Sequence, residues 1–193
     1  MKLVLASASK RRQDIFDMVG IKYTVVTSSD KEVSTAKSID EYVKDLSRHK
    51  AEAVAKKLNE PAVIVSADTV VYMDGKTYEK PKSKDEAFKS MKEMSGKKTY
   101  VYTGMTVKDT YQNKSVTDVD VCVVYVKEMS DDEIEWYVEN QENILDISGY
   151  AMLGKADMFL DRVEGDYNTL FGISPSKVYG MLKKLGYKLE DFT

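Results

Sequence analysis

The stretch at residues 61–81, "PAVIVSADTVVYMDGKTYEKP", decides the fold of this chain. Its long run of mostly apolar and β-branched residues predicts a buried strand that continues through most of the stretch. The pair Asp74-Gly75 then predicts a tight turn and a returning strand, because this dipeptide favours a two-residue hairpin. One carboxylate, Asp68, interrupts the apolar run and has to be explained.

Working outward from this stretch, helices and strands alternate toward both ends of the chain. The predicted helices are 9–20, 39–58, 83–96, 130–140 and 174–186, and the other predicted strands are 2–6, 22–27, 99–109, 115–126 and 156–166. Alternation at the ends with hairpins in the middle predicts an α/β fold with a mixed, twisted sheet. Because no linker-like segment divides the chain, we expect one domain over 1–193.

Composition narrows the function classes. The chain has 193 residues, is 42% hydrophobic and 32% charged, and carries a net charge of −3, as in an ordinary globular protein. A negative total with dispersed basic residues argues against a nucleic-acid partner. No run approaches about 20 apolar residues and no leader peptide opens the sequence, so we expect no membrane contact and a cytoplasmic location.

The single cysteine and single histidine exclude two kinds of site. Cys122 has no second cysteine to pair with, and the strand-like run "VDVCVVYV" predicts a buried, inert thiol. With only His49 beside it, a zinc site of the usual kind is excluded. Any metal here would be a hard cation held by carboxylates and phosphate.

The stretch "LASASKRR" at 5–12 poses an electrostatic question. Three cations begin a predicted helix, where the macrodipole favours anions. Each arginine, Arg11 and Arg12, precedes an apolar residue by four positions, which predicts that both guanidinium groups lie on the core side of the helix. A phosphate held by these arginines, the helix N–H groups and the hydroxyls of Ser7 and Ser9 would explain the pattern. A solvated basic turn is the alternative.

Lys50 lies on the apolar side of the helix predicted at 39–58. It follows Leu46 by four residues and precedes Val54 by four, so it falls on the stripe that should face the core. One interpretation is a lysine whose stem packs on the core while its ammonium reaches water. The other is a lysine that reaches into an anion-binding cleft.

Asp68 shares a strand face with Ile64, Ser66 and Val70. An unpartnered carboxylate on that face would be costly, so it needs a cation or a hydrogen-bond donor. It is either an aspartate that caps the backbone at a strand end, or a metal ligand or general base. The sequence alone leaves both interpretations open.

Two weaker candidates complete the inventory. Lys80, before Pro81, is predicted in extended backbone, and Glu32 has a solvated loop acid as its default interpretation. Together the candidates are four cations and two acids, which suits a polyphosphate substrate with a divalent metal, Mg²⁺ or Mn²⁺. The chain has neither a Walker-type loop nor a Gly-x-Ser-x-Gly elbow.

Several ordered segments resemble the Maf family of nucleotide pyrophosphatases. They run nearly end to end and read "LASASKRRQDIF", "LSRHKAEAVA", "VSADTVVYMDGKTYEKPKSKDEA", "MSGKKTYVYTGMTV" and "FLDRVEGDYNTLFGIS". The resemblance implies hydrolysis of nucleoside triphosphates between the α and β phosphates, giving a monophosphate and pyrophosphate. It also implies an α/β/α architecture akin to the inosine triphosphatases, with two lobes around a central cleft. The "ADTVV" and "EKP" forms look closest to the subgroup that acts on dTTP and UTP.

The resemblance assigns roles by motif position. The implied phosphate-holding residues are Ser7, Arg11, Arg12, Lys50 and Lys80. By the same resemblance, Asp68 would accept the proton of the attacking water and, with Glu32, place the divalent metal, while Thr69 falls where the family tunes base choice. Family members often dimerise, so a homodimer is a further expectation.

Four positions depart from the family pattern: Lys10 in place of a proline, Lys31 where an acid often stands, Asp146 in place of a lysine, and Leu153 in place of a glutamine. Leucine has no group that can hydrogen-bond a base edge, so we expect altered or relaxed base selectivity. The same departures keep an alternative open, in which the chain is a catalytically weak nucleotide-binding regulator of cell division.

Overall fold

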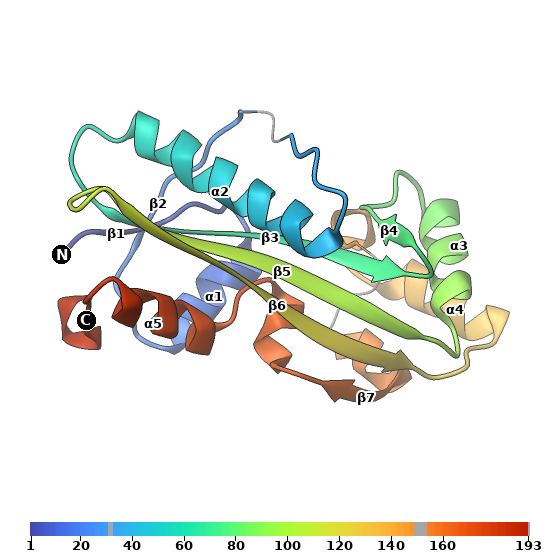
Figure 1. The fold of residues 1–193 in the computed structure, drawn as a ribbon. Coiled ribbons are helices and arrows are strands. Elements are labelled where there is room, and N and C mark those ends of the chain that lie inside the picture. The colour runs from blue at the N-terminus through green and yellow to red at the C-terminus, as the bar shows by residue number, and fades with distance from the viewer. Residues whose placement is uncertain (31–32, 149–153, 193) are drawn as a thin grey trace. The chain divides into compact units, whose positions relative to one another are not determined.

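The computed structural model describes residues 1–30, 33–148 and 154–192 (Figure 1). The helices are α1 (Lys10–Met18), α2 (Ile39–Lys57), α3 (Lys84–Met94), α4 (Asp131–Asn140) and α5 (Pro175–Lys184). The strands are β1 (Leu3–Leu5), β2 (Thr24–Val25), β3 (Val63–Met73), β4 (Lys76–Tyr78), β5 (Lys98–Asp109), β6 (Lys114–Val126) and β7 (Leu160–Glu164). Short 3₁₀ turns complete the described chain: η1 (Ile144–Asp146), η2 (Gly154–Phe159), η3 (Tyr167–Phe171) and η4 (Leu189–Asp191).

The strands form a mixed sheet, as the sequence predicted. Along the described chain they pair in the order β2-β1-β3-β5-β6-β7, and β4 pairs with β3. β1 runs parallel to both of its neighbours, with Val4 opposite Thr24 on one side and Ile64 on the other. β4 and β7 are antiparallel to β3 and β6. The α/β class with a mixed sheet is therefore confirmed.

The chain divides into two compact units. The first unit comprises Met1–Thr69, Tyr102–Asp120 and Phe171–Thr193, and the second comprises Val70–Val101 and Val121–Leu170. Three strands, β3, β5 and β6, contribute residues to both. That 1–193 act as a single domain, and that two lobes enclose a cleft, stay predictions.

The first unit has three layers, with helices on both faces of its strands (Figure 1). Residues of α1 and α5 pack on one face, in a core that includes Phe16, Val65 and Met181. Residues of α2 pack on the other face, where Val54 and Ile64 belong to a second core. Strand residues alternate between these cores because successive side chains point to opposite faces. Asp68, two residues apart from Ser66 and four from Ile64, therefore belongs to the α2 side.

The second unit contains the hairpin predicted from the Asp-Gly pair. Asp74 and Gly75 both adopt left-handed φ values, 52° and 81°, as a type I′ turn requires. Helices α3 and α4 pack against each other in this unit. Ser130 and Glu133 form a complete capping box at the start of α4. Each of these local structures follows from a turn or cap signal written in the sequence.

One expectation about local structure was only partly met. Residues 156–166 were predicted as a strand, but the 3₁₀ turn η2 occupies Gly154–Phe159 and only Leu160–Glu164 form β7.

The start of α3 is capped on two sides. Ser83 is the N-cap, and its Oγ accepts from the backbone N–H of Glu86. The Glu86 carboxylate accepts from the N–H of Lys82 at 2.7 Å, one residue before the N–H that a capping box uses.

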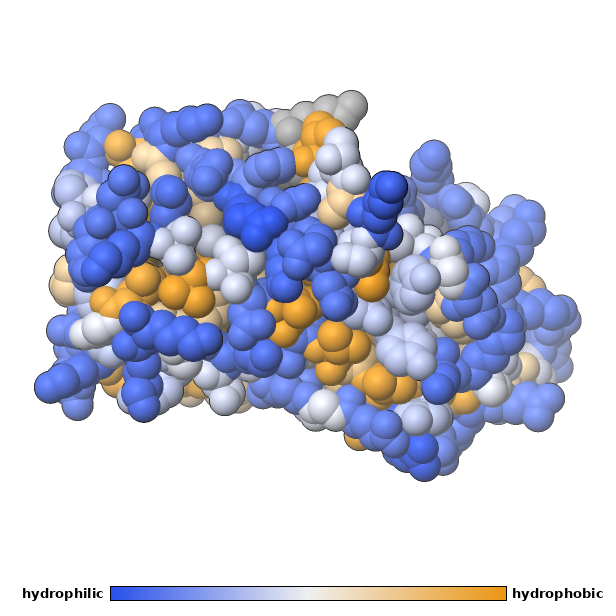
Figure 2. Space-filling view, in the orientation of Figure 1, coloured by the Kyte–Doolittle hydropathy of each residue, from blue (hydrophilic) through white to orange (hydrophobic). Residues whose placement is uncertain are grey.

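Hydrophilic residues cover most of the face of the protein shown in Figure 2, with smaller groups of hydrophobic residues between them. Cys122 is fully buried in β6, which confirms the burial that its surroundings predicted. No helix in the described part of the chain combines the length and apolarity that crossing a membrane requires.

Candidate active site

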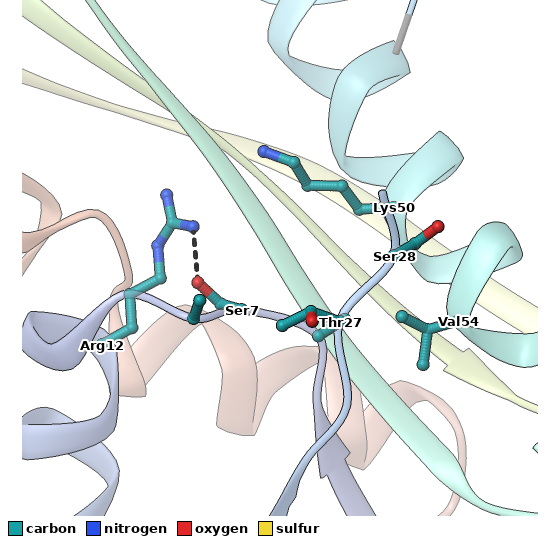
Figure 3. Close-up of a pocket in the computed structure, with 8 residues that line it drawn as sticks. Ser7, Arg12, Thr27, Ser28, Lys50 and Val54 are labelled. Atoms are coloured by element: carbon teal, nitrogen blue, oxygen red, sulfur yellow. Dashed lines mark hydrogen bonds between the residues drawn. The ribbon is translucent and has the colours of Figure 1, made fainter. Parts of the chain in front are cut away.

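A hollow of about 170 Å³ lies in the first unit, beside the loop that joins β1 to α1 (Figure 3). The residues lining it are Ala6, Ser7, Ala8, Arg12, Thr27, Ser28, Lys50 and Val54. They come from the β1–α1 loop, from α1, from the segment after β2 and from α2. Two of them are cations, and none of these described lining residues is a carboxylate, so the hollow suits an anion.

Arg12 is held on three sides. Its Nε donates to the carbonyl of Gly172 at 2.9 Å, one terminal nitrogen donates to Ser7 Oγ at 3.1 Å, and the other donates to Thr69 Oγ1 at 3.1 Å. Ser7 is itself fixed, because its Oγ also accepts from the N–H of Ser9 at 3.2 Å. A guanidinium fixed in this way presents its charge in one orientation, which favours recognition of a planar or tetrahedral anion.

The three cations at the start of α1 have different environments. Lys10 is exposed and pairs with Asp14 four residues on, which raises its pKa, so it is the solvated charge that the alternative interpretation described. Arg11 is half-buried and is not among the residues that line the hollow. Only Arg12 both turns toward the core side and lines the hollow. The prediction that both arginines hold phosphate therefore gains geometric support for Arg12 alone.

The start of α1 has features of an anion-binding helix end. Ser9 occupies the N-cap position, where serine is a favoured residue, but its side chain makes no capping hydrogen bond within the described chain. The backbone N–H groups of the first turn are therefore not satisfied by that cap. Together with the dipole of the helix, they favour a negative group in the adjacent hollow.

Lys50 connects this hollow to Asp68. Its Nζ lies 2.5 Å from Asp68 Oδ1, and the two side chains are 23% and 15% exposed. In Figure 3 the Lys50 side chain extends from α2 toward the region of the Arg12 guanidinium. The solvated, snorkelling interpretation of Lys50 is wrong, because its ammonium meets a largely buried carboxylate. Asp68 lies inside β3 rather than at a strand end, so the backbone-capping interpretation is also wrong.

A buried neutral contact lies next to this ion pair. Ser66, two residues before Asp68 on β3, donates from Oγ to the carbonyl of Ser47 at 2.6 Å. Ser47 lies three residues before Lys50 on α2, and its own Oγ is 2.9 Å from Thr106 Oγ1. Both serines are fully buried. These hydroxyl hydrogen bonds fix α2 against β3 and β5. They therefore hold Lys50 at the position along α2 from which its side chain reaches Asp68.

The remaining predicted residues belong to the second unit or fall outside the described residues. Lys80 is exposed in the second unit, so its proposed part in phosphate binding stays a prediction. Glu32, Lys31 and Leu153 lie outside the described residues. Asp146 is exposed at the end of η1 in the second unit.

The donor set near the hollow was tested against a divalent cation. Across 1–30, 33–148 and 154–192, no group of three or more His, Cys, Asp or Glu side chains could hold a metal ion by itself. Mg²⁺ commonly uses one or two carboxylates, substrate phosphates and waters rather than an all-protein cage. Asp68, a largely buried carboxylate that contacts Lys50 of the hollow, fits that mode of binding.

Sequence reasoning missed four residues of this region. Thr27 and Ser28 line the hollow, and Thr103 and Gly172 contact the group around Arg12. Thr103 lies in the "TYVYTGMTV" segment and Gly172 in "NTLFGIS", both of which carried the family resemblance but offered no chemical signal of their own. Small hydroxyl residues and glycines are common in loops and strands, so only the fold reveals which of them meet.

Comparison with known proteins identifies the class. A family model described as "Maf-like protein" matches residues 2–185. The match covers nearly the whole chain, and the site described above lies within it. The chain belongs to the Maf family.

Two named sequence relatives agree with this assignment. A protein of Thermoanaerobacter sp. (strain X514), named dTTP/UTP pyrophosphatase, is 39% identical over 184 residues, which cover 95% of this chain and 96% of that protein. A Fusobacterium nucleatum protein with the same name is 36% identical over 189 residues, 97% of each chain. Among solved structures, a HAM1 protein from Coxiella burnetii covers 99% of this chain and 95% of its own, with a TM-score of 0.49 and 11% identity.

Proposed function

We propose that this chain is a nucleoside triphosphate pyrophosphatase that hydrolyses the bond between the α and β phosphates, with dTTP and UTP as its first candidate substrates. The observation that carries the proposal is one side chain, Lys50, which lines the anion-binding hollow beside Arg12 and also contacts Asp68. Relatives that are 39% and 36% identical over nearly the full chain carry the name dTTP/UTP pyrophosphatase, which supports it.

The proposed chemistry divides among three side chains. Arg12 and Lys50 bind the phosphate oxygens and stabilise the charge that builds up on the departing pyrophosphate. Asp68 accepts a proton from the water that attacks phosphorus, and the bridging oxygen leaves with its electron pair as part of pyrophosphate. Because Lys50 contacts Asp68 in this structure, a phosphate that draws the ammonium toward itself leaves the carboxylate available to the water.

A divalent cation completes the proposal. Asp68 would hold it, with Glu32 as the predicted second carboxylate, and when bound it would neutralise phosphate charge and lower the pKa of a bound water. Lys80 and Arg11 are proposed as further phosphate contacts, and Thr69 as a residue near the base. A homodimer, a cytoplasmic location and the absence of nucleic-acid or membrane partners likewise stay predictions.

Base selectivity is the least constrained part of the proposal. Leu153 replaces the glutamine expected of pyrimidine-specific members, so we expect relaxed preference among bases. The alternative, a nucleotide-binding regulator with weak catalysis, is not favoured, because Arg12, Lys50 and Asp68 lie together as a hydrolytic site requires.

The test is pyrophosphate release from a panel of canonical and modified nucleoside triphosphates, with Mg²⁺ or Mn²⁺. We expect release from several triphosphates, including dTTP and UTP, together with one equivalent of monophosphate. Binding without turnover across the panel would favour the regulator instead. Strict selectivity for dTTP and UTP would contradict the expectation drawn from Leu153 while leaving the activity intact.

A further inference from the structure

Thr103 lies directly behind the group that orients Arg12. It is fully buried on β5, and its Oγ1 is 2.9 Å from Thr69 Oγ1. Thr69 in turn accepts from a terminal nitrogen of Arg12 at 3.1 Å. A chain of contacts thus runs from the strand interior through Thr69 to the guanidinium at the hollow. All three residues belong to the first unit.

The direction of the hydrogen bond between Thr69 and Thr103 determines how many lone pairs of the Thr69 hydroxyl are available to Arg12. A hydroxyl has one proton and two lone pairs, and an arginine nitrogen can only donate. If the proton of Thr69 points to Thr103, both lone pairs face outward and one meets the guanidinium. If Thr103 donates instead, one lone pair of Thr69 remains for the guanidinium, and the proton of Thr69 needs another acceptor. An acceptor at Thr103 therefore gives that proton a partner and leaves both lone pairs of Thr69 to the arginine side.

Gly172 limits the space around this pair. Its φ is +87°, and a Cβ placed there would lie 2.9 Å from Thr69 Oγ1 and 3.0 Å from two nitrogens of Arg12. The guanidinium and the threonine hydroxyl therefore pack directly against backbone. Close packing leaves no free space around these groups. A change in the orientation of the Thr69 hydroxyl therefore displaces the Arg12 guanidinium.

We propose that Thr103 is a positioning residue for phosphate binding: by accepting a hydrogen bond from the hydroxyl of Thr69, it orients Thr69 to accept from Arg12 and so fixes the guanidinium toward the hollow. The inference rests on the proposed function, since it assigns Arg12 to phosphate. It adds a residue that does not itself line the hollow.

The test compares two variants at one position. Thr103→Val keeps the shape and removes the hydroxyl, whereas Thr103→Ser keeps the hydroxyl and removes a methyl. Loss of a neutral hydrogen bond corresponds to a change of roughly three- to tenfold in an equilibrium constant. We expect Thr103→Val to weaken binding of inorganic pyrophosphate, measured by calorimetry, and to raise KM for the triphosphate by that factor. Because Arg12 is also proposed to stabilise charge on the departing pyrophosphate, kcat should fall by no more than the same factor, and Thr103→Ser should stay near the unsubstituted protein.

Thr110→Val is the control. Thr110 follows β5, and its Oγ1 accepts from the N–H of Ala62 at 2.8 Å and donates to the carbonyl of Ala62 at 3.0 Å. Neither residue lines the hollow. The variant should lose stability in urea denaturation and leave both pyrophosphate affinity and KM unchanged. If Thr110→Val or Thr103→Ser matches Thr103→Val in the binding assay, the inference is overturned.

A double-mutant experiment tests whether the effect of Thr103→Val on pyrophosphate affinity depends on Arg12. In Arg12→Lys, which lacks the forked guanidinium, the further change Thr103→Val should have little effect on pyrophosphate affinity, because coupled residues are not additive. An undiminished effect there would overturn the proposal. Should Thr103→Val fail to fold, Thr103→Ala serves as the second hydroxyl-free variant.

The outcomes separate this inference from the proposed function. An unsubstituted protein that binds pyrophosphate but releases none from any triphosphate would contradict the proposed function, and the affinity comparison would still decide the role of Thr103. An unsubstituted protein that does not bind pyrophosphate would overturn the inference, because Arg12 would then have no phosphate to hold.

Discussion

Two lysine–carboxylate pairs in this chain look alike until their surroundings are compared. Lys50 and Asp68 in the first unit, and Lys76 and Glu93 in the second, each join a helix to a strand, with N–O distances of 2.5 and 2.8 Å. The Lys76–Glu93 side chains are 58% and 47% exposed, and the pair lies beside Tyr78, which also donates to Glu93. Exposed pairs of this kind contribute about 0–1 kcal/mol to stability.

The Lys50–Asp68 pair differs in burial and in its neighbours. Both side chains are largely buried, and Lys50 also lines a hollow with Arg12. A short distance between opposite charges therefore does not identify a functional pair. A second cation and a space for a ligand beside the pair are what favour a functional role for Lys50 and Asp68 in the proposal, and substitutions in both pairs test that distinction.

The largest effect should come from removing the proposed base. Asp68→Asn keeps the shape of the side chain but cannot accept the proton, so turnover should fall by roughly 10²–10⁴-fold, the usual contribution of general-base catalysis. Steady-state pyrophosphate release measures it, and calorimetry with a triphosphate should show that binding survives. The control is Glu93→Gln in the second unit, which should leave turnover unchanged. Near-full activity in Asp68→Asn would refute the role assigned to Asp68.

The next effect concerns the two lysines. Lys50→Met removes a charged donor from the hollow, and a hydrogen bond to a charged group contributes about 1.5–3 kcal/mol, so KM should rise roughly 10- to 100-fold. Lys76→Met removes an equally positive but exposed group and should leave KM unchanged. Steady-state kinetics of pyrophosphate release give KM for both variants and test this difference. Equal effects of the two substitutions would mean that the hollow is not where phosphate binds.

Two left-handed glycines provide a finer test. Gly172 (φ +87°) and Gly75 (φ +81°) share a conformation that costs other residues about 1–2 kcal/mol, but only Gly172 would bring a Cβ against Arg12 and Thr69. Both alanine variants should lose stability in urea denaturation. Only Gly172→Ala should also raise KM, by several-fold, because it displaces the guanidinium. If Gly75→Ala raises KM equally, the effect is a general loss of folded protein.

The smallest effect is a pH dependence of stability, and it compares two tyrosine–carboxylate bonds. Burial and the hydrogen bond to Asp109 at 2.7 Å raise the pKa of Tyr187 to about 12, and burial and Glu93 likewise raise the pKa of Tyr78. A raised folded-state pKa gives stability that is fully present below the unfolded value of about 10 and is lost as the pH rises through about 12.

The variant Tyr187→Phe tests whether Tyr187 makes the free energy of unfolding fall as the pH rises. At neutral pH the variant should lose about 1–3 kcal/mol, because Asp109 is fully buried and loses a donor. Between pH about 10 and 12 its free energy of unfolding should fall less steeply than that of the unsubstituted protein, which chemical denaturation at several pH values measures. Parallel curves would show that Tyr187 titrates normally. Activity at neutral pH should not change, since this pair lies outside the hollow.

Local structure followed closely from the sequence where a cap, a turn or a periodic face was present. The apolar spacing of 39–58 predicted α2 to within one residue, and the Asp-Gly pair predicted the hairpin of β3 and β4. The C-terminal strand was less well predicted, because η2 and β7 share one short apolar segment in which the helical and extended periods do not separate.

The site was predictable in its charged members and not in its neutral ones. Arg12, Lys50 and Asp68 are anomalies in the sequence, since each places a charge where the pattern requires an apolar residue. Arg11, equally anomalous, does not line the hollow. The neutral residues fit their local sequence patterns, so the sequence did not indicate the roles of Ser47, Thr103 and Gly172.

By itself the sequence determined the α/β class, the charged residues that needed partners and the membership of the Maf family, because periodicity and misplaced charge are local properties. Only the tertiary structure decided which charges meet. Arg12, Lys50 and Asp68 come from three different elements, and the hydroxyls and carbonyl that orient them come from β1–α1, β3, β5 and the segment before α5. Contacts between residues up to 160 positions apart depend on how helices pack on a sheet, which no local pattern encodes.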